Sequence, residues 1–233
     1  MKVFDDEIKK MHSRLKEGKP FSFGKFCDGE WMAMRGVPVN NGEFQSNANT
    51  DSVSKMLIDA FKYKHDDYYV GVSCPCCQGD DHQRMVDFSE QDQEHLTFAN
   101  IFVNSNYDYF VNNVIPSFND FKVHLIANGN SRLDKLPFTV EEFYPVGFSA
   151  AENNIDLVDQ IINKNLEGKL FLFCCGPFGN ILAHKLWVSN KKNIYLDIGS
   201  TLNPFLESEG FRRSYFDRDS ECGKKFCVWG ESL

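Results

Sequence analysis

The sequence lacks several features that would put it in other classes of protein. It has no run of 18 or more apolar residues, so we expect no membrane-spanning helix. The segment Met1–Lys10 is charged and mixed, unlike a secretory signal peptide, and favours a cytoplasmic location. Basic residues are not in excess: Lys and Arg number 25 against 33 Asp and Glu, for a net charge of −8. Because nucleic-acid binding depends on clustered basic side chains that neutralise phosphates, we expect no nucleic-acid partner.

Internal repeats, low-complexity tracts and linkers rich in Pro, Gly or Ser are also missing. Nothing in the composition therefore divides the chain, and we expect a single domain over residues 1–233. Of these residues 42% are hydrophobic and 22 are Phe, which is enough for a chain of this length to form an apolar core without disulfides or metals.

Short apolar segments alternate with segments of helical character along the chain. The apolar segments predict strands at Phe21–Phe26, Tyr68–Val72, Ile101–Val103, Val123–Ala127, Leu170–Cys174 and Ile194–Ile198. Helical patterns occupy Phe4–Leu15, Glu30–Met34, a stretch capped by Thr50 or Asp51, Glu94–Asn100, Tyr107–Ile115, Ala150–Asn163 and Phe178–Ser189. This alternation predicts an α/β fold with a Rossmann-like, doubly wound, mainly parallel sheet flanked by helices. Such sheets bind ligands at the carboxyl ends of their strands.

The first candidate site follows the first predicted strand, in the motif Lys25-Phe-Cys-Asp28-Gly29-Glu30. Asp28 and Glu30 are one residue apart at a strand-to-helix turn, and Gly29 allows the backbone to bend there. Hard oxygen ligands of this kind suit a divalent cation, Mn²⁺ or Mg²⁺, which can neutralise a diphosphate. The alternative is a solvated turn whose acidic residues stabilise the dipole of the following helix.

The second candidate site is a glycine-bearing turn between a buried strand and a helix. The strand Leu170–Cys174 leads into a turn formed by Gly176, Pro177, Phe178, Gly179 and Asn180. Backbone N–H groups at a helix start attract phosphate or carboxylate, so these residues are candidates for binding a diphosphate. The motif is neither G-x-G-x-x-G nor a Walker sequence, and a close-packed strand-to-helix turn is the alternative interpretation.

Two further strand ends carry polar residues. Asp197 lies at the carboxyl end of a strand, where it can orient a sugar hydroxyl or accept a proton; a structural Asp that caps the following loop is the alternative. Asn128 and Arg132 follow another predicted strand, and their polar groups can contact a bound ligand. A plain surface turn is the alternative interpretation.

These motifs resemble the GT-D type glycosyltransferases, a family first known as a domain of unknown function in bacterial adhesin glycosylation. The family's opening strand ends in a pattern close to Phe-x-Arg-x-Gly-Asp-Gly-Glu. The segment Phe23–Glu30 matches it, with Lys25 in place of Arg and Cys27 in place of Gly. Lysine keeps the charge but lacks the fork with which Arg grips a phosphate.

The carboxyl-terminal half of the chain continues the resemblance. The family has a strand with a Gly-Pro turn and then a strand that ends in Asp-Ile-Gly, and Phe171–Asn180 and Leu196–Ser200 correspond to them. Between residues 36 and 122 the match rests on element order alone. The resemblance covers most of the chain and implies the GT-D variant of the Rossmann-like fold.

The resemblance implies transfer of a sugar from a nucleotide diphosphate sugar, with a UDP-sugar preferred, to a saccharide or glycosylated acceptor. The enzyme would be a hexosyl- or pentosyltransferase in which Asp28 and Glu30 hold the Mn²⁺ or Mg²⁺, and Lys25 and Gly29 contact the donor. We expect inversion at the sugar in preference to retention. Asp197 is our candidate for the base, and Glu152, Asp156 and Asp28 are the alternatives.

Two other functions remain open from the sequence. One is another nucleotide-dependent transferase on the same fold, such as a methyltransferase, although the glycine-rich signature after the first strand is lacking. The other is a non-enzymatic interaction module that holds zinc through the cysteine-rich loop and its possible partners, which are Cys74, Cys76, Cys77, His82, Cys222 and Cys227. This spacing matches no standard zinc finger, so we favour reduced free thiols for these cysteines.

Overall fold

The computed structural model describes residues 2–40, 44–46, 51–206 and 214–230 of the chain. Its centre is a seven-stranded sheet with the strand order β5-β4-β1-β9-β8-β6-β7, in which all described pairings are parallel. The strands of this sheet are β1 (Phe21–Phe26), β4 (Tyr68–Val72), β5 (Leu96–Phe98), β6 (Lys122–Asn128), β7 (Val140–Val146), β8 (Lys169–Cys174) and β9 (Ile194–Asp197). A separate antiparallel pair is formed by β2 (Val39–Asn40) and β3 (Gln45–Ser46).

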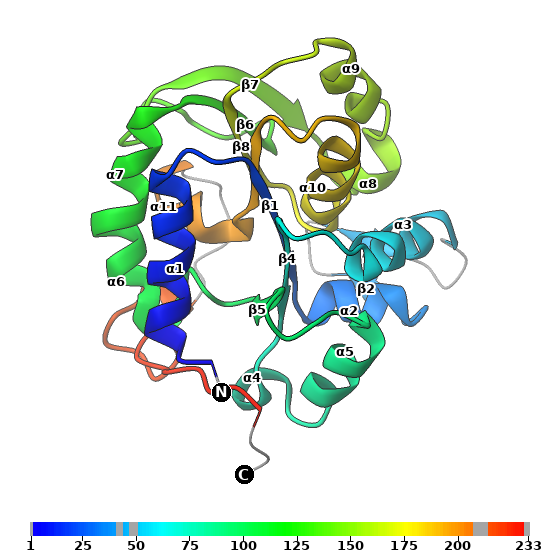
Figure 1. Ribbon diagram of the computed structural model, residues 1–233, viewed down its shortest axis with the longest axis vertical. Helices are drawn as coiled ribbons and strands as arrows, with labels where there is room; N and C mark the ends of the chain where they lie inside the picture. Colours follow the sequence, from blue (N-terminus) through cyan, green and yellow to red (C-terminus); the bar gives the residue numbers. More distant parts are fainter. Residues whose placement is uncertain (1, 41–43, 47–50, 207–213, 231–233) are drawn as a thin grey trace.

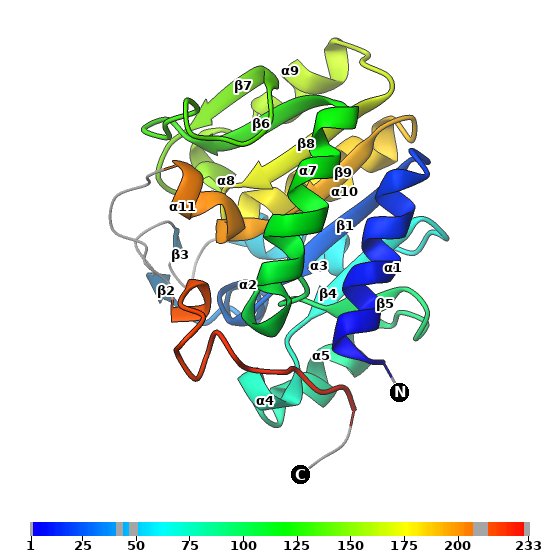
Figure 2. The ribbon, with the colours of Figure 1, turned by 90° about the vertical axis from the view of Figure 1, so that its left-hand side faces the viewer.

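Helices cover both faces of the sheet, which gives three layers (Figure 1). One face carries α2 (Asp28–Met34), α3 (Asp51–Lys62), α5 (Asp81–Ser89), α8 (Ala150–Asn153), α9 (Leu157–Asn163) and α10 (Pro177–Ser189). The opposite face carries α1 (Phe4–Lys16), α6 (Tyr107–Tyr109), α7 (Ile115–Ser117) and α11 (Asn203–Leu206), and Figure 2 looks onto these helices. The expected α/β fold, Rossmann-like with a parallel sheet flanked by helices, is confirmed.

The remaining short elements connect these layers. They are α4 (Pro75–Gln78), the 3₁₀ turns η1 (Asn104–Asn106), η3 (Phe118–Asp120), η4 (Gly199–Leu202) and η5 (Ser214–Phe216), and a π-helical segment η2 (Phe110–Val114). In the part of the chain that the structure describes, none of the helices combines the length and the apolar character needed to span a bilayer.

The core lies on both faces of the central strands. Because helices cover both faces, strands such as β8 are nearly continuous apolar runs, and its residues 170–173 are almost fully buried. Aromatic rings supply much of the contact: Phe171 stacks on Tyr195 with ring centres 5.1 Å apart, and Phe26 meets Phe61 at 4.7 Å. The expectation that Phe residues build this core is confirmed.

Helix α10 is buried along most of its length and is fixed to β1 by two side chains. The Ser22 hydroxyl donates to the carbonyl of Ala183 at 2.9 Å, and the Asn180 amide donates to the carbonyl of Lys25 at 3.0 Å. Pro177 begins the helix, a position where its missing N–H is not needed. These contacts hold the start of α10 beside the carboxyl end of β1.

Two predicted elements between β4 and β6 are wrong. The segment Glu94–Asn100, predicted as a helix, contains β5, and Ile101–Val103, predicted as a strand, forms a turn that leads into η1. Both segments are too short for periodicity to separate strand from helix. Pairing decides the outcome, because Leu96 lies beside Val70 of β4, whereas Ile101 and Phe102 are buried without a strand partner.

Other differences have local causes. Strand β7 was not predicted, since Glu141, Glu142 and Pro145 are unfavourable in strands; they are tolerated because β7 is an edge strand. The single helix predicted over Ala150–Asn163 is interrupted between α8 and α9. Helix α3 begins at Asp51, and the alternative cap at Thr50 lies outside the described residues.

Candidate functional site

The loops that follow five adjacent strands surround one cavity of about 220 Å³. The strands are β5, β4, β1, β9 and β8, and because they are parallel their carboxyl ends meet at the same edge of the sheet. The lining residues are Lys25, Cys27, Asp28, Gly29, Glu30, Cys77, Asn100, Asn104, Cys174, Gly176, Asp197, Gly199, Ser200, Asn203 and Cys222. The cavity lies where the sequence predicts ligand binding for a sheet of this type.

The structure brings part of the predicted site together at this cavity. The residues shared by the prediction and the lining are Lys25, Asp28, Gly29, Glu30, Gly176 and Asp197. The rest of the Gly-Pro turn, residues 177–180, is buried beneath the cavity, where the Asn180 side chain bonds the backbone of β1. The predicted contacts of Pro177, Phe178, Gly179 and Asn180 with a donor stay predictions.

Asn128 and Arg132 do not line the cavity. Asn128 ends β6 and Arg132 follows it, and β8 separates β6 from β9 and β1. The Asn128 side chain accepts the N–H of Asn130 at 2.9 Å, and the Arg132 guanidinium pairs with Asp134 at 2.9 Å on the surface. These contacts match the surface turn that was the alternative interpretation.

Lys25 brings positive charge into the cavity. Its Nζ donates to the Cys27 Sγ at 3.0 Å, and its side chain crosses over Gly199, where an added Cβ would lie 3.3 Å from Nζ. Burial raises the pKa of Cys27 to about 11, so at neutral pH this acceptor is a thiol. Burial raises the pKa of both Glu30 and Asp197, and the ammonium group of Lys25 opposes this rise at each carboxyl.

Asp28 and Glu30 have different environments at the start of α2. The Glu30 Oε2 accepts the N–H of Cys27 at 2.9 Å, which caps the helix, and burial raises the pKa of Glu30. Asp28 is exposed to solvent at the cavity. This cap was not predicted, since the alternative from the sequence was stabilisation of the helix dipole in a solvated turn, and it occupies one oxygen of Glu30.

The two carboxyl groups are the candidate ligands of a divalent cation. Mg²⁺ and similar ions are held by one or two carboxylates together with substrate phosphates, so a full cage of protein ligands is not required. Asp28 offers an exposed carboxylate, and a cation beside Glu30 would offset the penalty that burial places on its charged form. Both groups line the same cavity as Lys25.

Asp197 is the most deeply buried carboxyl group of the site, with 2% of its surface exposed. Its Oδ1 accepts the N–H of Gly199 at 3.0 Å, and an added Cβ at Gly179 would lie only 3.0 Å from its Cγ. Burial raises the pKa of Asp197 to about 8, against the lowering influence of Lys25. The contact with Gly199 is the loop cap that was the alternative interpretation, and the predicted contact with a sugar hydroxyl stays a prediction.

Three asparagines of the lining were not predicted. Asn100 and Asn104 follow β5, a strand that the sequence analysis placed elsewhere, and Asn203 begins α11. Asn104 adopts a left-handed backbone with φ of 56°, a conformation in which Asn is the commonest residue after Gly. Had β5 been placed correctly, the asparagines that follow it would have stood at the carboxyl end of a strand and so would have been candidates for the site.

Gly176 has the backbone that makes it the most sensitive position of the Gly-Pro turn. With φ of 57° and ψ of −144° it lies in a region open only to glycine, although an added Cβ would meet nothing within 4 Å.

We expect both Gly176→Ala and Gly176→Val to lose about 1–3 kcal/mol of unfolding free energy. Because Gly176 lines the cavity, we expect the larger valine, but not alanine, to weaken UDP binding as well. A folded Gly176→Val protein with normal UDP affinity in titration calorimetry would exclude contact between this turn and the donor.

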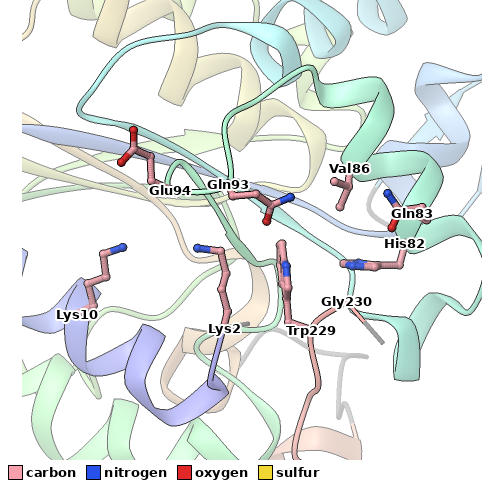
Figure 3. A pocket seen from close by; sticks show the side chains of 9 residues that line it. All are labelled: Lys2, Lys10, His82, Gln83, Val86, Gln93, Glu94, Trp229 and Gly230. Carbon is pink, nitrogen blue, oxygen red and sulfur yellow. The ribbon is translucent and has the colours of Figure 1, made fainter. Parts of the chain in front are cut away.

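A larger groove of about 700 Å³ lies apart from this site. Lys2, Lys10, His82, Glu94 and Trp229 are among its lining residues, and Figure 3 shows the Trp229 ring between Lys2 and His82. The groove contains none of the residues predicted to bind the sugar donor or the divalent cation. The smaller cavity at the strand ends is therefore the candidate site, because it combines three carboxyl groups with Lys25.

No protein-family model matches the sequence, and no curated protein matches it. Solved structures do share its fold. One is described as a new glycosyltransferase, DUF1792, from Streptococcus sanguinis; it is 14% identical, with a TM-score of 0.59 over 95% of this chain and 97% of that chain. Another is described as the highly conserved domain of unknown function 1792 with a distinct glycosyltransferase fold. It is also 14% identical, with a TM-score of 0.58 over 83% of this chain and 77% of that chain.

Proposed function

We propose that the protein is a glycosyltransferase that moves a sugar from a nucleotide diphosphate sugar, preferably a UDP-sugar, to a hydroxyl of a saccharide or glycosylated acceptor. The observation that supports this most is the joint lining of one cavity by Asp28, Glu30, Asp197, Lys25 and Gly176. The fold likeness to structures described as glycosyltransferases adds to it.

The charges of the cavity suit the departure of a nucleoside diphosphate. When the bond between the sugar and the diphosphate breaks, negative charge develops on the β-phosphate, and prearranged positive groups stabilise it. Lys25 supplies one such group from the end of β1. Mn²⁺ or Mg²⁺ held by Asp28 and Glu30 would supply further positive charge to the same phosphate.

The size of the cavity limits which part of the donor it holds. Protein sites for small molecules and cofactors usually occupy about 300–1,000 Å³. At about 220 Å³ the cavity matches the diphosphate with its cation better than a complete nucleotide sugar. We assign it to the diphosphate, with the nucleoside lying across the surrounding strand-end loops.

Asp197 is the best candidate for the base of an inverting reaction. It lines the cavity, whereas Glu152 and Asp156, the alternatives outside the first motif, are exposed on or beside α8 and do not line it. With a pKa near 8, Asp197 accepts a proton from a hydroxyl more readily than an ordinary aspartate does. Nearby Lys25 favours the charged form that a base requires.

A screen of nucleotide sugars for hydrolysis tests this function. In the presence of Mn²⁺ or Mg²⁺ we expect slow release of nucleoside diphosphate from one donor, with UDP-sugars preferred, because water can replace the acceptor. EDTA should stop the release. Binding of S-adenosylmethionine without metal, and no hydrolysis of any nucleotide sugar, would instead favour the methyltransferase alternative and exclude this proposal.

A further inference from the structure

Four cysteines from distant parts of the sequence gather beside the candidate site. They are Cys74, Cys76 and Cys77, in the loop and short helix α4 after β4, and Cys227 near the carboxyl-terminal end. Their sulfur atoms all lie within 4.8 Å of one another. We propose that these four cysteines bind one zinc ion, which holds the carboxyl-terminal segment against the strand-end loops.

The spacing of the sulfur atoms suits a single tetrahedral ion. Sulfurs that lie about 2.3 Å from a tetrahedral zinc are about 3.8 Å from one another. The sulfurs of Cys74 and Cys76 are 3.0 Å apart and all four lie within 4.8 Å of one another, so the observed separations lie on both sides of that value. An iron–sulfur cluster places several iron and sulfide ions between its cysteines and therefore needs a wider set. All four cysteines lie outside disulfides.

The surroundings of the cluster suit thiolates. Asn100 Nδ2 donates to the Cys77 Sγ at 3.3 Å, and Asn104 Nδ2 donates to the Cys227 Sγ at 3.3 Å. Lys225 places its ammonium group at the carbonyl of Cys76. Four thiolates around Zn²⁺ carry two net negative charges, which N–H donors and a nearby cation stabilise.

The structure separates these four ligands from the other candidates in the sequence. His82 uses its Nδ1 to bond the carbonyl of Ser73 at 2.7 Å and lies against the Trp229 ring. Cys222 lies against the Asn104 side-chain oxygen at 3.9 Å. Neither residue belongs to the group whose ligand atoms lie close enough to share one ion. A site of four cysteines therefore replaces the mixed set of Cys and His considered from the sequence.

Zinc at this position would stabilise a segment that has little backbone support. Residues 217–230 form neither helix nor strand, yet Cys227 is fully buried. The Trp229 ring lies beside His82 (Figure 3), and its centre is 5.0 Å from that of His82 and 5.1 Å from that of Phe98. The same segment brings Cys222 to the cavity at the strand ends. A structural zinc would therefore fix one wall of that cavity without taking part in its chemistry, since all four ligand positions are filled by protein.

Metal analysis of the whole protein tests the proposal. Protein purified under reducing conditions without added metal should contain about one zinc per chain by mass spectrometry of the elements. Cys227→Ser and Cys77→Ser should each lose most of this zinc, and Cys222→Ser, the matched control, should keep it. Cys77 is exposed, so its substitution keeps the test valid even if Cys227→Ser does not fold.

Cobalt provides a second readout that does not depend on enzyme activity. After zinc removal, Co²⁺ should give the visible absorption of tetrahedral thiolate coordination in the native protein and in Cys222→Ser but not in Cys77→Ser. Chelation should lower the thermal unfolding midpoint, since metal binding is coupled to folding. The proposal would be overturned if the native protein contained no zinc, if it contained iron in place of zinc, or if both ligand variants kept their full zinc content. These outcomes do not depend on the result of the nucleotide-sugar screen.

Discussion

Replacing Asp28 by Asn is expected to abolish the gain in UDP affinity given by Mn²⁺ or Mg²⁺ and to slow sugar transfer about 10²–10³-fold, the usual cost of losing one charge-stabilising group. The substitution keeps the size of the side chain and removes its charge. Because Asp28 is exposed, the fold should be unaffected, and the unfolding midpoint should match that of the native protein.

Titration calorimetry with UDP in Mn²⁺ and in EDTA measures this effect. Glu30→Gln should also lose the metal-dependent gain while its side-chain oxygen still caps α2 through the Cys27 N–H. Asp134→Asn is the control, since that carboxylate lies on the surface beside Arg132. Equal UDP affinity of the native protein in Mn²⁺ and in EDTA would contradict the assignment of Asp28 and Glu30 to a metal.

Asp197→Asn is expected to reduce turnover about 10²–10⁴-fold, the range for loss of a general base. The Asn oxygen can still accept the Gly199 N–H, so the loop cap remains. In the native enzyme kcat/KM should rise with pH up to about 8, where the raised pKa of Asp197 lies, and this rise should vanish in the variant. A folded and fully active Asp197→Asn protein would refute the role as base and leave only the cap.

Stability gives an independent check on the buried state of Asp197. Its pKa rises from 3.8 to about 8 on folding, so the native state holds a proton that the unfolded chain has lost between these values. The native protein should therefore lose stability as pH rises from about 4 to about 8, and the Asn variant should lose less. If the unfolding midpoints of the two proteins change equally with pH over this range, Asp197 is not held in an apolar site.

Much of the fold could be predicted because its central strands are buried on both faces. Every residue of β4 is buried, and β8 contains four consecutive apolar residues, 170–173. Edge strands lack this signal. The three-residue β5 and the acidic β7 are defined by their neighbours in the sheet, and local sequence does not carry that information.

The site residues that could be predicted are those at the carboxyl ends of the central strands. Asp28 and Gly176 follow strands that were placed correctly, Asp197 ends a third such strand, and the three residues meet at one cavity. Asn100 and Asn104 were missed because β5 was misplaced. The cysteine cluster could not be assembled from spacing, since 150 residues separate Cys77 from Cys227 and only the fold brings them together.

The two proposed metal sites use opposite ligand chemistry side by side. Oxygen ligands at Asp28 and Glu30 suit Mg²⁺ or Mn²⁺, and sulfur ligands at the cysteine cluster suit zinc. Cys77 lines the cavity and belongs to the cluster, so the two sites share a boundary. We expect chelators selective for zinc to affect stability first, and EDTA to affect donor binding as well.

A crystal structure of the protein with UDP and Mn²⁺ tests the central claim most directly. Anomalous scattering at the manganese edge should reveal one ion in contact with Asp28, with the diphosphate beside Lys25 and the Gly176 turn at the carboxyl ends of β1, β9 and β8. UDP bound elsewhere, for example in the groove lined by Trp229, or UDP in the cavity without manganese at Asp28, would contradict the account.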